Sequence, residues 1–550
     1  MHLPKIDKFF NIAGPSQMDI HYTLDPLRRI NYEEISRLID QRGYFVLHAP
    51  RQTGKTTSLL AMVNKINEES KYRCAYVNVE TAQTTRHDVE AGMKAILSAF
   101  ASAVEIFLEM PKARELILPV ISETGGHGAL KRTLEVFCKN LDKPLVLFID
   151  EIDSLIGDTL VSVLRQLRDA YANRPQFAPI SIILCGLRDI RDYRIHRSDG
   201  EIITGGSCFN IKTKSLRLGN FSQDDIRELY SKHTEATGQV FEDYIYPKVW
   251  ELTHGQPWLV NALAYQVTSE MREGRDRSRP ITLDMIEEAA GQLIISRATH
   301  LDQLTDKLKE PRIQQIIAPM AAGGNWQDTP APSADDIEYA IDLGLLRREG
   351  EGKALVISNE MYREIIPREL TSIMQDNMAA QPAQPWYINE GGRIDMSKLL
   401  REFQQFFREN SESWLERFDY KEAGFQLLLQ AFLQRIVNGG GLINREYALG
   451  RGRVDLLVRW RYPANTTRCK QKEQRIVLEL KTIRDSRTAT PERVLSDGLK
   501  QTAHYAAQSN AEEAHLIICD ERRDRTWNEK IYERGEKNGD SENLIKVWGV

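Results

Sequence analysis

Two groups of residues in this chain have the types and spacing that phosphate chemistry requires. The first lies at Ala49–Thr57, which reads Ala-Pro-Arg-Gln-Thr-Gly-Lys-Thr-Thr and follows the apolar run Tyr44–Leu47. Backbone N–H groups of such a loop, with the positive end of the helix that follows, can surround a triphosphate. Lys55 can then reach the β- and γ-phosphates, and the Thr56 hydroxyl can hold Mg²⁺. The loop predicts that the protein binds ATP or GTP.

One position departs from the usual pattern of this loop, because Ala49 stands where the pattern has its first glycine. Alanine is small, so we expect the loop to turn all the same. The residues expected to contact the nucleotide are Pro50, Arg51, Gln52, Thr53, Gly54, Lys55, Thr56 and Thr57.

A second part of the same group follows the apolar run Leu145–Ile149, which ends in Asp150 and Glu151. A buried strand would bring both carboxylates to its carboxyl end, where open α/β sheets bind ligands. Asp150 would contact Mg²⁺ through water, and Glu151 would polarise the water that attacks the phosphate. The alternative is an ordinary strand that ends in an acidic turn. With the loop upstream, we expect hydrolysis as well as binding.

The second group lies near the end of the sequence, at Asp455, Glu479 and Lys481. Asp455 leads into one apolar strand and Glu479 lies in the next, so the two carboxylates can meet if the strands pair in register. Two carboxylates and a backbone carbonyl, here that of Leu480, suit Mg²⁺. Lys481 is two residues from Glu479 and shares its face of the strand. It can orient a water whose pKa the ion lowers, next to a scissile phosphate.

The bulk properties are those of an ordinary soluble protein. The 550 residues are 41% hydrophobic and 27% charged, with a net charge of −5. No general basic field indicates a nucleic acid, so any such contact must come from local patches. There is no run of about 18 apolar residues and no signal-peptide core, and the six cysteines are scattered without paired spacing. We therefore expect a cytoplasmic protein with reduced cysteines, no disulfide or zinc site, and no membrane contact.

Alternating elements surround the first group. Apolar runs alternate with helical patterns over residues 30–215, which predicts a parallel α/β sheet. Residues 220–300 read as mostly helical. Residues 300–370 read as helices followed by a hairpin, the outline of a winged helix. The expected strands are Tyr44–His48, Cys74–Val79, Leu145–Ile149 and Ile180–Cys185, and the expected helices include Val89–Leu108, Leu160–Tyr171, Gln223–Thr237, Ile245–Leu252 and Ala334–Leu345.

On these residues, the first part of the chain resembles AAA+/STAND-type P-loop ATPases. Further motifs support this: Leu164–Arg168 after the acidic pair, Leu184–Asp189 at the next strand end, and Thr253–Leu259 with its Gly-x-Pro element. The resemblance implies a core with an additional strand, a helical lid that brings Pro257 to the nucleotide, and a winged helix. It implies that His21–Pro26 packs near the adenine, although a structural lead-in is an equal alternative.

The resemblance leaves the phosphate sensor open. Leu187 stands where the family usually has Asn, Ser or Thr, and Arg188 stands beside it as a nucleotide contact. Arg165, Arg168 and Arg188 are candidate arginine fingers, with surface salt bridges as the alternative role of each.

The second group resembles the PD-(D/E)XK nucleases, Mrr-like and RecB-like members included. Glu422 on the predicted helix Tyr420–Val437 matches an additional metal-linked glutamate of that family. Gln501 and Tyr505 form a Gln-x-x-x-Tyr element one helical turn apart, and Leu516–Asp520 supplies the last strand. Residues 459–474 read as a long basic hairpin loop, either a nucleic-acid contact or a solvated turn.

Together these features predict a multidomain α/β protein. The expected parts are a lead-in segment at 1–29, a P-loop ATPase core at 30–219, a helical lid at 220–300, a winged-helix-like part at 301–372, a linker at 373–395 and a restriction-endonuclease-like α/β domain at 396–550. The expected cofactors are ATP and Mg²⁺, and the expected partner is DNA, with RNA and a homo-oligomer as further options.

Three functions are compatible with these parts. The first is an ATPase that controls a Mg²⁺-dependent nuclease, in defence against foreign DNA or in DNA repair. The second is a STAND-like sensor that assembles on a trigger. The third is a DNA-binding helper ATPase with a nuclease fold that does not cleave.

Overall fold

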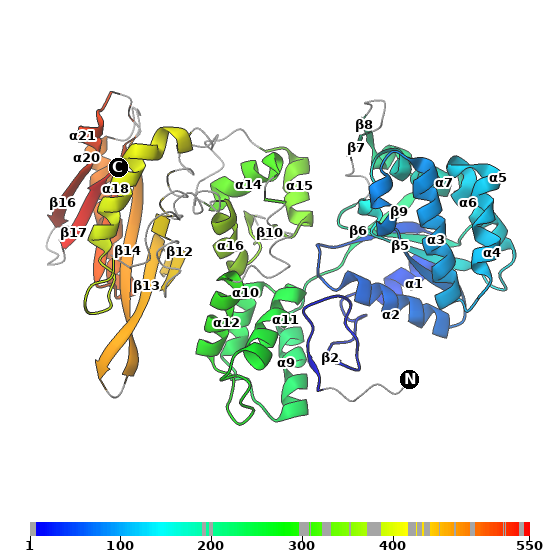
Figure 1. Ribbon diagram of the computed structural model, residues 1–550, viewed down its shortest axis with the longest axis horizontal. Helices are drawn as coiled ribbons and strands as arrows, with labels where there is room; N and C mark the ends of the chain where they lie inside the picture. The colour runs from blue at the N-terminus through cyan, green and yellow to red at the C-terminus, as the bar shows by residue number, and fades with distance from the viewer. Residues whose placement is uncertain are drawn as a thin grey trace. The chain divides into compact units, whose positions relative to one another are not determined.

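The structure is a computed structural model of the 550-residue chain. It describes residues 7–189, 194–196, 202–295, 307–308, 310–321, 332–350, 354–370, 387–415, 425, 429, 432–433, 441–449, 452–466, 469–483, 490–520, 522, 524–537 and 544–550. The chain divides into two compact units (Figure 1). Unit 1 is Met1–Leu293 with Ile337–Asn359, and unit 2 is Ile294–Asp336 with Glu360–Val550. Each unit is described by itself.

Unit 1 contains a five-stranded parallel sheet in the order β4-β5-β6-β3-β9. Strand β6 lies between the strand that precedes the P-loop and the strand that ends in Asp150, so the predicted additional strand is present. The α/β parallel sheet is confirmed. The strands are β3 (Tyr44–His48), β4 (Arg73–Asn78), β5 (Leu145–Asp150), β6 (Ser181–Gly186) and β9 (Lys212–Arg217).

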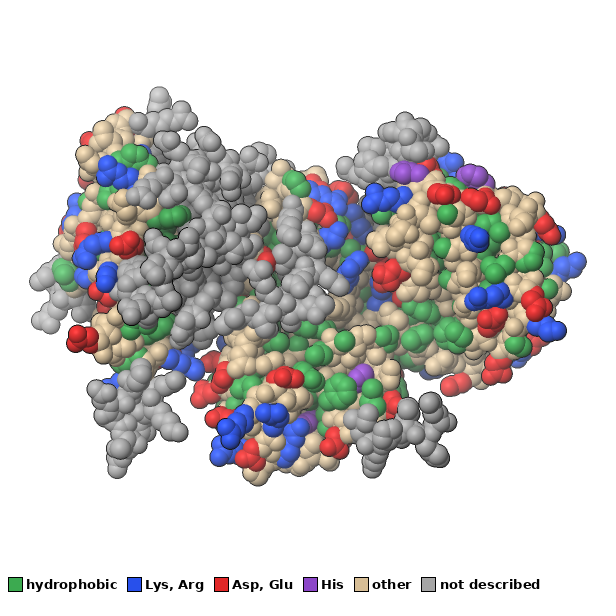
Figure 2. Space-filling model, viewed as in Figure 1, with side chains coloured by type: hydrophobic (Ala, Val, Ile, Leu, Met, Phe, Trp, Pro, Cys, Tyr) green, Lys and Arg blue, Asp and Glu red, His purple; other side chains and the backbone are tan. Residues whose placement is uncertain are grey.

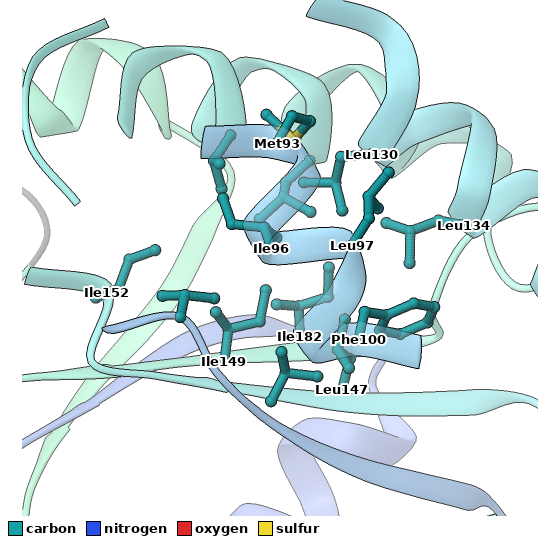
Figure 3. Close-up of a cluster of buried hydrophobic side chains, with 14 of the residues drawn as sticks. Met93, Ile96, Leu97, Phe100, Leu130, Leu134, Leu147, Ile149, Ile152 and Ile182 are labelled. Carbon is teal, nitrogen blue, oxygen red and sulfur yellow. The ribbon is translucent and has the colours of Figure 1, made fainter. Parts of the chain in front are cut away.

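Helices cover both faces of this sheet because its central strands β3, β5 and β6 are apolar on both sides. One face packs against α1 (Tyr32–Asp40) and α2 (Lys55–Glu68). The other packs against α3 (Val89–Phe107), α6 (Gly126–Lys139) and α7 (Gly157–Ala170). Figure 3 shows the centre of the second layer, where Leu97 and Phe100 of α3 lie over Leu147 of β5. These layers hold the carboxyl ends of β3 and β5 in place.

Shorter elements complete the core. On the face drawn in Figure 2, acidic and basic side chains are interspersed over this part of the molecule. The elements are β1 (Phe9–Phe10), β2 (His21–Tyr22), η1 (Glu80–Thr85), α4 (Ala113–Ile117), α5 (Pro119–Thr124), η2 (Ile152–Ser154), η3 (Tyr171–Asn173), β7 (Arg194–His196), β8 (Ile202–Thr204) and α8 (Gly205–Cys208).

A helical subdomain follows the sheet. Ser222 caps its first helix through a reciprocal capping box with Asp225. The buried Tyr230 hydroxyl donates a hydrogen bond of 2.8 Å to the carbonyl of Val260, which joins two of the helices. The elements are α9 (Gln223–Thr237), α10 (Ile245–Thr253), α11 (Pro257–Tyr265), the π-helical η5 (Gln266–Glu270) and α12 (Leu283–Ile295).

The segment expected to form a winged helix is shared between the units. The end of α15 (Ala334–Asp342) and the antiparallel hairpin of β10 (Leu346–Glu349) and β11 (Ala354–Ile357) belong to unit 1. Helices α14 (Pro311–Ala321) and α16 (Glu360–Leu370) belong to unit 2. The helix and hairpin order is the expected one, and a separate winged-helix domain at 301–372 stays a prediction.

Unit 2 contains a six-stranded mixed sheet in the order β12-β13-β14-β15-β17-β16. Helix α18 (Met396–Leu415) packs on the face that carries Leu456, Ile476 and Leu478. Helix α20 (Pro491–Ser509) packs on the opposite face. The remaining elements are β12 (Gly441–Leu449), β13 (Gly452–Thr466), β14 (Cys469–Ile483), β15 (Glu513–Asp520), α21 (Trp527–Lys530), β16 (Tyr532–Lys537) and β17 (Leu544–Gly549).

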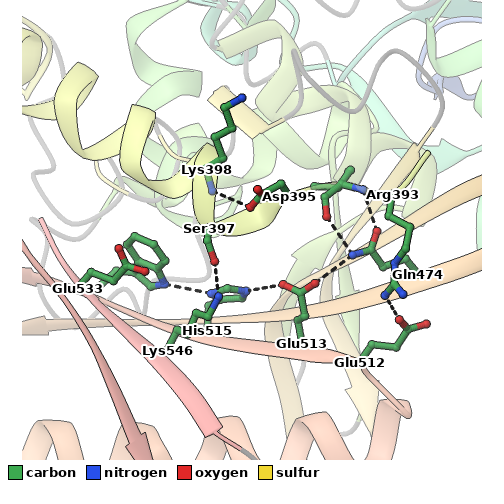
Figure 4. A network of polar contacts seen from close by, with 12 residues as sticks. Arg393, Asp395, Ser397, Lys398, Gln474, Glu512, Glu513, His515, Glu533 and Lys546 are labelled. Carbon is green, nitrogen blue, oxygen red and sulfur yellow. Dashed lines mark hydrogen bonds and ion pairs between the residues drawn. The ribbon is translucent and has the colours of Figure 1, made fainter. Parts of the chain in front are cut away.

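A buried polar network ties the α18 side of this sheet to the segment before α18 (Figure 4). The Trp548 indole N–H donates to Nδ1 of His515 at 3.0 Å, so Nε2 of the neutral ring faces Glu513 at 3.4 Å. Burial lowers the pKa of His515 below its ordinary value, which keeps the ring neutral. Gln474 exchanges two hydrogen bonds with the backbone of Ile394. The network fixes β14, β15 and β17 relative to residues 387–395.

Two expectations about unit 2 are corrected. Residues 387–395 are not a linker, because Ile394 is buried in the core and Gly392 accepts a hydrogen bond of 2.8 Å from the Trp460 indole. The basic segment 459–474 is not a long loop, because β13 runs to Thr466 and β14 begins at Cys469. Arginine, threonine and tyrosine tolerate an extended backbone, so cross-strand pairing continues through this segment. The segment has no apolar pattern from which the sequence could predict the strands.

No helix among the described residues is long and apolar enough to cross a membrane.

Candidate functional site

The loop after β3 has the backbone shape of a phosphate-binding loop. Gly54 has φ +78° and Gln52 has φ +57°, so two residues of the loop adopt the left-handed conformation. For Gln52 this costs about 1–2 kcal/mol, and such strain is typical of functional sites. Ala49 is buried, and its N–H donates to the carbonyl of Gly186 at 3.2 Å. The small side chain at position 49 therefore suits the turn, as expected.

Lys55 begins α2 and points at the acidic pair. Its Nζ lies 3.8 Å from a carboxylate oxygen of Asp150 and 3.8 Å from one of Glu151. Burial alone would lower the pKa of Lys55, but the two carboxylates raise it above its ordinary value. The two carboxylates thus favour the charged ammonium form of this buried lysine. A separation of 3.8 Å leaves it loosely held, so that phosphate oxygens can replace the carboxylates as its partners.

The carboxylate of Asp150 is the hub of the site. It is fully buried, and its Oδ2 accepts hydrogen bonds from Tyr76 at 2.8 Å and from Thr56 at 3.3 Å. Its Oδ1 accepts the backbone N–H of Glu151 at 2.9 Å. The Thr56 hydroxyl and the Asp150 carboxylate are hard oxygen ligands within reach of one another, as Mg²⁺ at a P-loop requires.

Glu151 is held in a strained conformation beside this hub. Its φ of +58° places a bulky residue in the left-handed region. Burial raises the pKa of Glu151 above the ordinary glutamate value, with contributions from Asp153 and Asp150, although Lys55 works against the shift. A carboxylate with a raised pKa accepts a proton more readily, which is the property a general base needs.

A pocket next to the loop is closed by two segments far apart in the sequence. The backbone N–H of Ser16 donates to Oγ1 of Thr57 at 3.0 Å, and the Trp258 indole donates to the carbonyl of Ile12 at 2.8 Å. The pocket is lined by Asn11, Ile12, Ala13, Gly14, Ser16, Tyr22, Thr23, Leu24, Asp25, Pro26, Arg29, Gln52, Gly54, Thr57, Ser58, Phe221, Leu229, Pro257, Trp258 and Asn261. The lead-in segment and the lid therefore meet at the loop.

The lid reaches the loop through its Gly-x-Pro element. A Cβ on Gly255 would lie 2.0 Å from the carbonyl oxygen of Phe221, so only glycine fits there. Gln256 caps α11 by accepting the Leu259 N–H at 2.6 Å, and its Nε2 lies 3.5 Å from the carbonyl oxygen of Gln52. Pro257 then opens α11 at the pocket.

Arg29 is a site residue that the sequence did not suggest. Its guanidinium lies 2.8 Å from where a Cβ of Gly54 would be, donates to the Gly219 carbonyl at 2.9 Å, and packs over the Phe221 ring. Burial lowers the pKa of Arg29 to about 10, so it stays charged at neutral pH. A second cation therefore stands beside the loop. Its only sequence signal was its place in the lead-in segment before α1.

The three candidate finger arginines occupy different environments. Arg188 is buried over the Tyr339 ring, 3.7 Å from the carboxylate of Asp342, in unit 1. Arg168 donates to the Ser207 carbonyl at 3.2 Å, which gives it a structural role. Arg165 is exposed in a surface pocket with His87, His127 and Asp158 among its lining residues. Leu187 is apolar and buried, so Arg188 is the polar candidate at the sensor position.

In unit 2, Glu479 and Lys481 form a close pair on the α20 side of β14. The Lys481 ammonium lies 2.7 Å from Oε1 of Glu479, whose side chain is 3% exposed. Leu456 pairs with Leu478, so Asp455 is the β13 position facing Glu479 in the continued register. The side chain of Asp455 lies outside the described residues, as does Glu422. Within the described residues, no group of three or more acidic, His or Cys side chains is arranged around a metal position.

Helix α20 covers this pair. A Cβ on Gly498 would lie 3.2 Å from Cγ of Lys481, so glycine lets the helix approach the lysine. Tyr505 is buried against Leu457 and Val477, one step along the same face from Glu479. Gln501 is exposed at the edge of the helix. Leu480 pairs with Ile517 of β15. The helix thus places Tyr505 on the face of the sheet that carries Glu479, whereas the structure leaves Gln501 at the surface.

Comparisons with known proteins agree with the first site. Residues 38–193 match the family model described as an AAA domain. That part of the chain is an AAA-type P-loop ATPase, which implies ATP as its ligand, usually with Mg²⁺, and ATP hydrolysis. No curated protein matches the chain.

Several solved structures are similar to part of the chain. The Walker-type ATPase PABY2304 of Pyrococcus abyssi is 13% identical, with a TM-score of 0.45, and the match covers 65% of this chain and 99% of that one. The ORC2 protein of Aeropyrum pernix is 16% identical, with a TM-score of 0.34 and coverage of 64% and 93%. RuvB of Thermotoga maritima is 12% identical, with a TM-score of 0.32 and coverage of 61% and 93%.

Proposed function

We propose that the protein is an ATP-hydrolysing control module joined to a Mg²⁺-dependent nuclease that acts on DNA. The ATPase half follows from the AAA-type domain and its buried Lys55–Asp150–Glu151 cluster. The observation that carries the nuclease half is the contact of 2.7 Å between Lys481 and the buried Glu479, at the strand position that faces Asp455. The nuclease activity, its DNA substrate and its control by ATP belong to this proposal.

At the first site, each residue has a separate task. Lys55 and Arg29 supply positive charge to the phosphates, and Glu151 accepts the proton of the attacking water. Thr56 and Asp150 would hold Mg²⁺. The bound ion would neutralise the charge that develops on the phosphates. Tyr76 fixes the Asp150 carboxylate by donating to Oδ2. The pocket beside Pro257 and Trp258 receives the base.

At the second site, the carboxylates of Asp455 and Glu479, with the Leu480 carbonyl, would hold Mg²⁺, which lowers the pKa of a bound water and stabilises charge on the scissile phosphate. Lys481 orients the attacking water and Tyr505 supports the face on which Glu479 lies. Gln501 and Glu422 complete the proposed set. Burial of Glu479 beneath α20 keeps its carboxylate in one orientation.

The proposed domains have the bounds that we expect from the sequence. Residues 301–372 would form a winged-helix-like part, and residues 396–550 would form the nuclease-like domain. The protein would bind DNA, assemble as a homo-oligomer, and act in the cytoplasm in defence against foreign DNA or in DNA repair.

A STAND-like sensor is the second candidate, and the surroundings of Arg188 favour it. This arginine follows β6, where a phosphate sensor belongs, yet its guanidinium faces Tyr339 and Asp342. A nucleotide that draws Arg188 away would change how residues 337–342 are held. Nucleotide-dependent assembly measured by light scattering, with no cleavage of any substrate, would favour this candidate over the first.

The test of the proposed function is a cleavage assay on a panel of substrates. Linear, circular and single-stranded DNA and RNA are each incubated with Mg²⁺, with ATP, with a non-hydrolysable analogue and without nucleotide. We expect cleavage of DNA by the wild type. Glu479→Gln should reduce the rate about 100-fold or more, because a metal ligand is lost. Lys500→Gln changes an exposed residue on α20, the helix that covers Glu479. It is the control and should leave cleavage intact.

ATP hydrolysis by these variants should equal that of the wild type, since it belongs to the other unit. If the wild type cleaves none of these substrates under any nucleotide condition while hydrolysing ATP, the nuclease half of the proposal is wrong. The helper ATPase with a non-cleaving fold would then be the better description.

A further inference from the structure

The strongest local charge that the sequence presents lies at residues 459–475, where β13 runs to Thr466 and β14 begins at Cys469 to form a two-stranded ribbon. Within these residues stand Arg459, Arg461, Arg468, Lys470, Lys472 and Arg475, against the single acid Glu473, in a chain whose net charge is −5. We propose that this ribbon is an arm that binds double-stranded DNA in its major groove. The inference rests on the proposed function and adds the surface and the duplex form that the nuclease would recognise.

The backbone of the ribbon has the shape that a groove requires. Strands β13 and β14 pair in register from Arg459↔Arg475 to Tyr462↔Lys472, with an irregularity between Pro463 and Thr466 before the last pair Thr466↔Cys469. Within the described strands, β12 pairs with β13 only as far as Trp460, and β15 pairs with β14 only from Ile476. The two strands therefore continue beyond the sheet by themselves (Figure 1).

Two strands about 4.8 Å apart, with their side chains, match a major groove about 12 Å wide.

A like-charged pair at the base of the ribbon supports a binding role. Arg459 and Arg475 are direct cross-strand neighbours, and such a pair lowers the stability of a sheet. Glu473 lies between them and accepts 2.8 Å and 2.7 Å hydrogen bonds from the two guanidinium groups. The bridge holds two arginines side by side on one face. Since one carboxylate offsets only one of them, a net positive charge remains for phosphates.

Further cations continue outward from this pair. Arg461 shares the face of Arg459, whereas Lys472 pairs with Tyr462 on the other face. Both side chains are exposed, and neither makes a hydrogen bond or ion pair with the described residues. Unpaired, solvated cations on both faces of an arm are available to neutralise phosphates on either wall of a groove.

The root of the arm is rigid. The Trp460 indole donates to the Gly392 carbonyl at 2.8 Å, and Arg393 packs over the Tyr462 ring with 5.6 Å between guanidinium and centroid. Gln474 is fully buried and bonds to Ile394 (Figure 4). A fixed root means that DNA contacts made by the arm also position the rest of the domain.

The arm and the candidate metal position share their strands. Glu479 lies ten residue steps beyond Cys469 along β14, which is about 33 Å at about 3.3 Å per residue. That length corresponds to about ten base-pair steps of about 3.4 Å. Glu479 and Arg475 lie on the same face of β14. A duplex bound along the arm would therefore extend along that face to Glu479. We expect protection of about one helical turn on one side of the cut.

The experiment compares duplex binding by two variants that lose the same charge. Arg461→Gln with Lys472→Gln removes two exposed cations from the arm, and Arg525→Gln with Arg534→Gln removes two exposed cations elsewhere in unit 2. Binding of a fluorescent 30-base-pair DNA is measured by anisotropy over a salt series, in EDTA, so that no cleavage occurs. The arm variant should bind about 10- to 100-fold more weakly, and its log–log salt slope should fall by about 2.

An RNA duplex of the same length is the second probe, because its major groove is deep and narrow. It should compete at least about tenfold less well than the DNA duplex. Equal competition by RNA, or an arm variant that matches the control variant in affinity and salt slope, would overturn the inference. A variant that instead aggregates while binding DNA normally would show that the charges protect an exposed strand pair from association.

Because binding is measured without Mg²⁺, a protein that fails to cleave can still pass this test. Conversely, a protein that cleaves DNA with an unaffected arm variant would uphold the proposed function and refute the arm.

Discussion

The two candidate sites each set a lysine beside carboxylates at a sheet, but they assemble the arrangement differently. In unit 1, Lys55 starts a helix while Asp150 and Glu151 end a strand, and their charged atoms lie 3.8 Å apart. In unit 2, Lys481 and Glu479 lie on one strand, and their charged atoms lie 2.7 Å apart. The first arrangement is open to an incoming anion, and the second is already closed.

The difference reflects what each site must admit. A nucleotide brings several charges of its own, so Lys55 has to exchange carboxylate partners for phosphate partners during binding. The proposed nuclease site would instead need its lysine fixed relative to the metal ligand before the large substrate arrives. Strand alternation provides that fixed geometry without any contribution from loops. Because the two lysines lie in separate units, we expect that each can be removed without disturbing the other site.

The largest expected effect separates the two lysines. Lys55→Ala should lower ATP hydrolysis about 100-fold or more, because a buried charge aimed at the phosphates is lost. The rate of phosphate release measures ATP hydrolysis. Lys94→Ala, a change at an exposed residue of α3, is the matched control. DNA cleavage measured without nucleotide should be unchanged by Lys55→Ala. A loss of both activities would show that the sites are not independent.

A smaller effect concerns the pH dependence of the first site. Because the pKa of Glu151 is raised, the residue takes up its proton at a higher pH than an ordinary glutamate with a pKa of 4.5. The base form is therefore present at high pH and is lost as pH falls through the raised pKa, with hydrolysis dropping about tenfold per pH unit below it. Initial rates of phosphate release between pH 4.5 and 8 measure this acid limb of the pH profile, in which hydrolysis falls with pH.

Glu151→Gln supplies the control for the pH profile. Its residual hydrolysis should be low and without this limb. A wild-type limb that follows the ordinary glutamate value would contradict the role given to burial.

The smallest expected effect concerns Tyr76, for which unit 2 has no described counterpart. Tyr76→Phe removes the hydrogen bond to Asp150 while it keeps the ring against Phe107. Losing a hydrogen bond to a charged group costs about 1.5–3 kcal/mol at most. We expect the Mg²⁺ concentration for half-maximal nucleotide binding to rise about 3- to 10-fold. Isothermal titration with ATP at several Mg²⁺ concentrations measures this, and an unchanged Mg²⁺ dependence would mean that Tyr76 only packs.

Sequence reasoning located the elements of unit 1 with strong periodic patterns. The expected strand Tyr44–His48 and helix Gln223–Thr237 have the bounds that the structure gives them. An apolar run marks the strand, and a capping box marks the start of the helix. Strand β9 was missed because Lys212–Arg217 is largely polar and finds its place only through pairing with β3. The ribbon was read as a loop for the same reason.

The candidate sites were predictable where chemistry is local in the sequence. Lys55, Asp150 and Glu151 were found because the loop and the strand end each carry their own pattern. Arg29 and Tyr76 were not found, because nothing near them in the sequence distinguishes a site residue from any other arginine or tyrosine. Only the fold brings Arg29 beside Gly54 and Tyr76 beside Asp150.

The segment that lies across the pocket beside the phosphate-binding loop has a consequence for turnover under the proposed function. Ser16 donates a hydrogen bond to Thr57, and Ile12 accepts one from Trp258. If ATP binds with its base in this pocket, entry of ATP and departure of ADP would require residues 11–16 to separate from the loop and the lid. The lifetime of bound ADP would then depend on how often these contacts open.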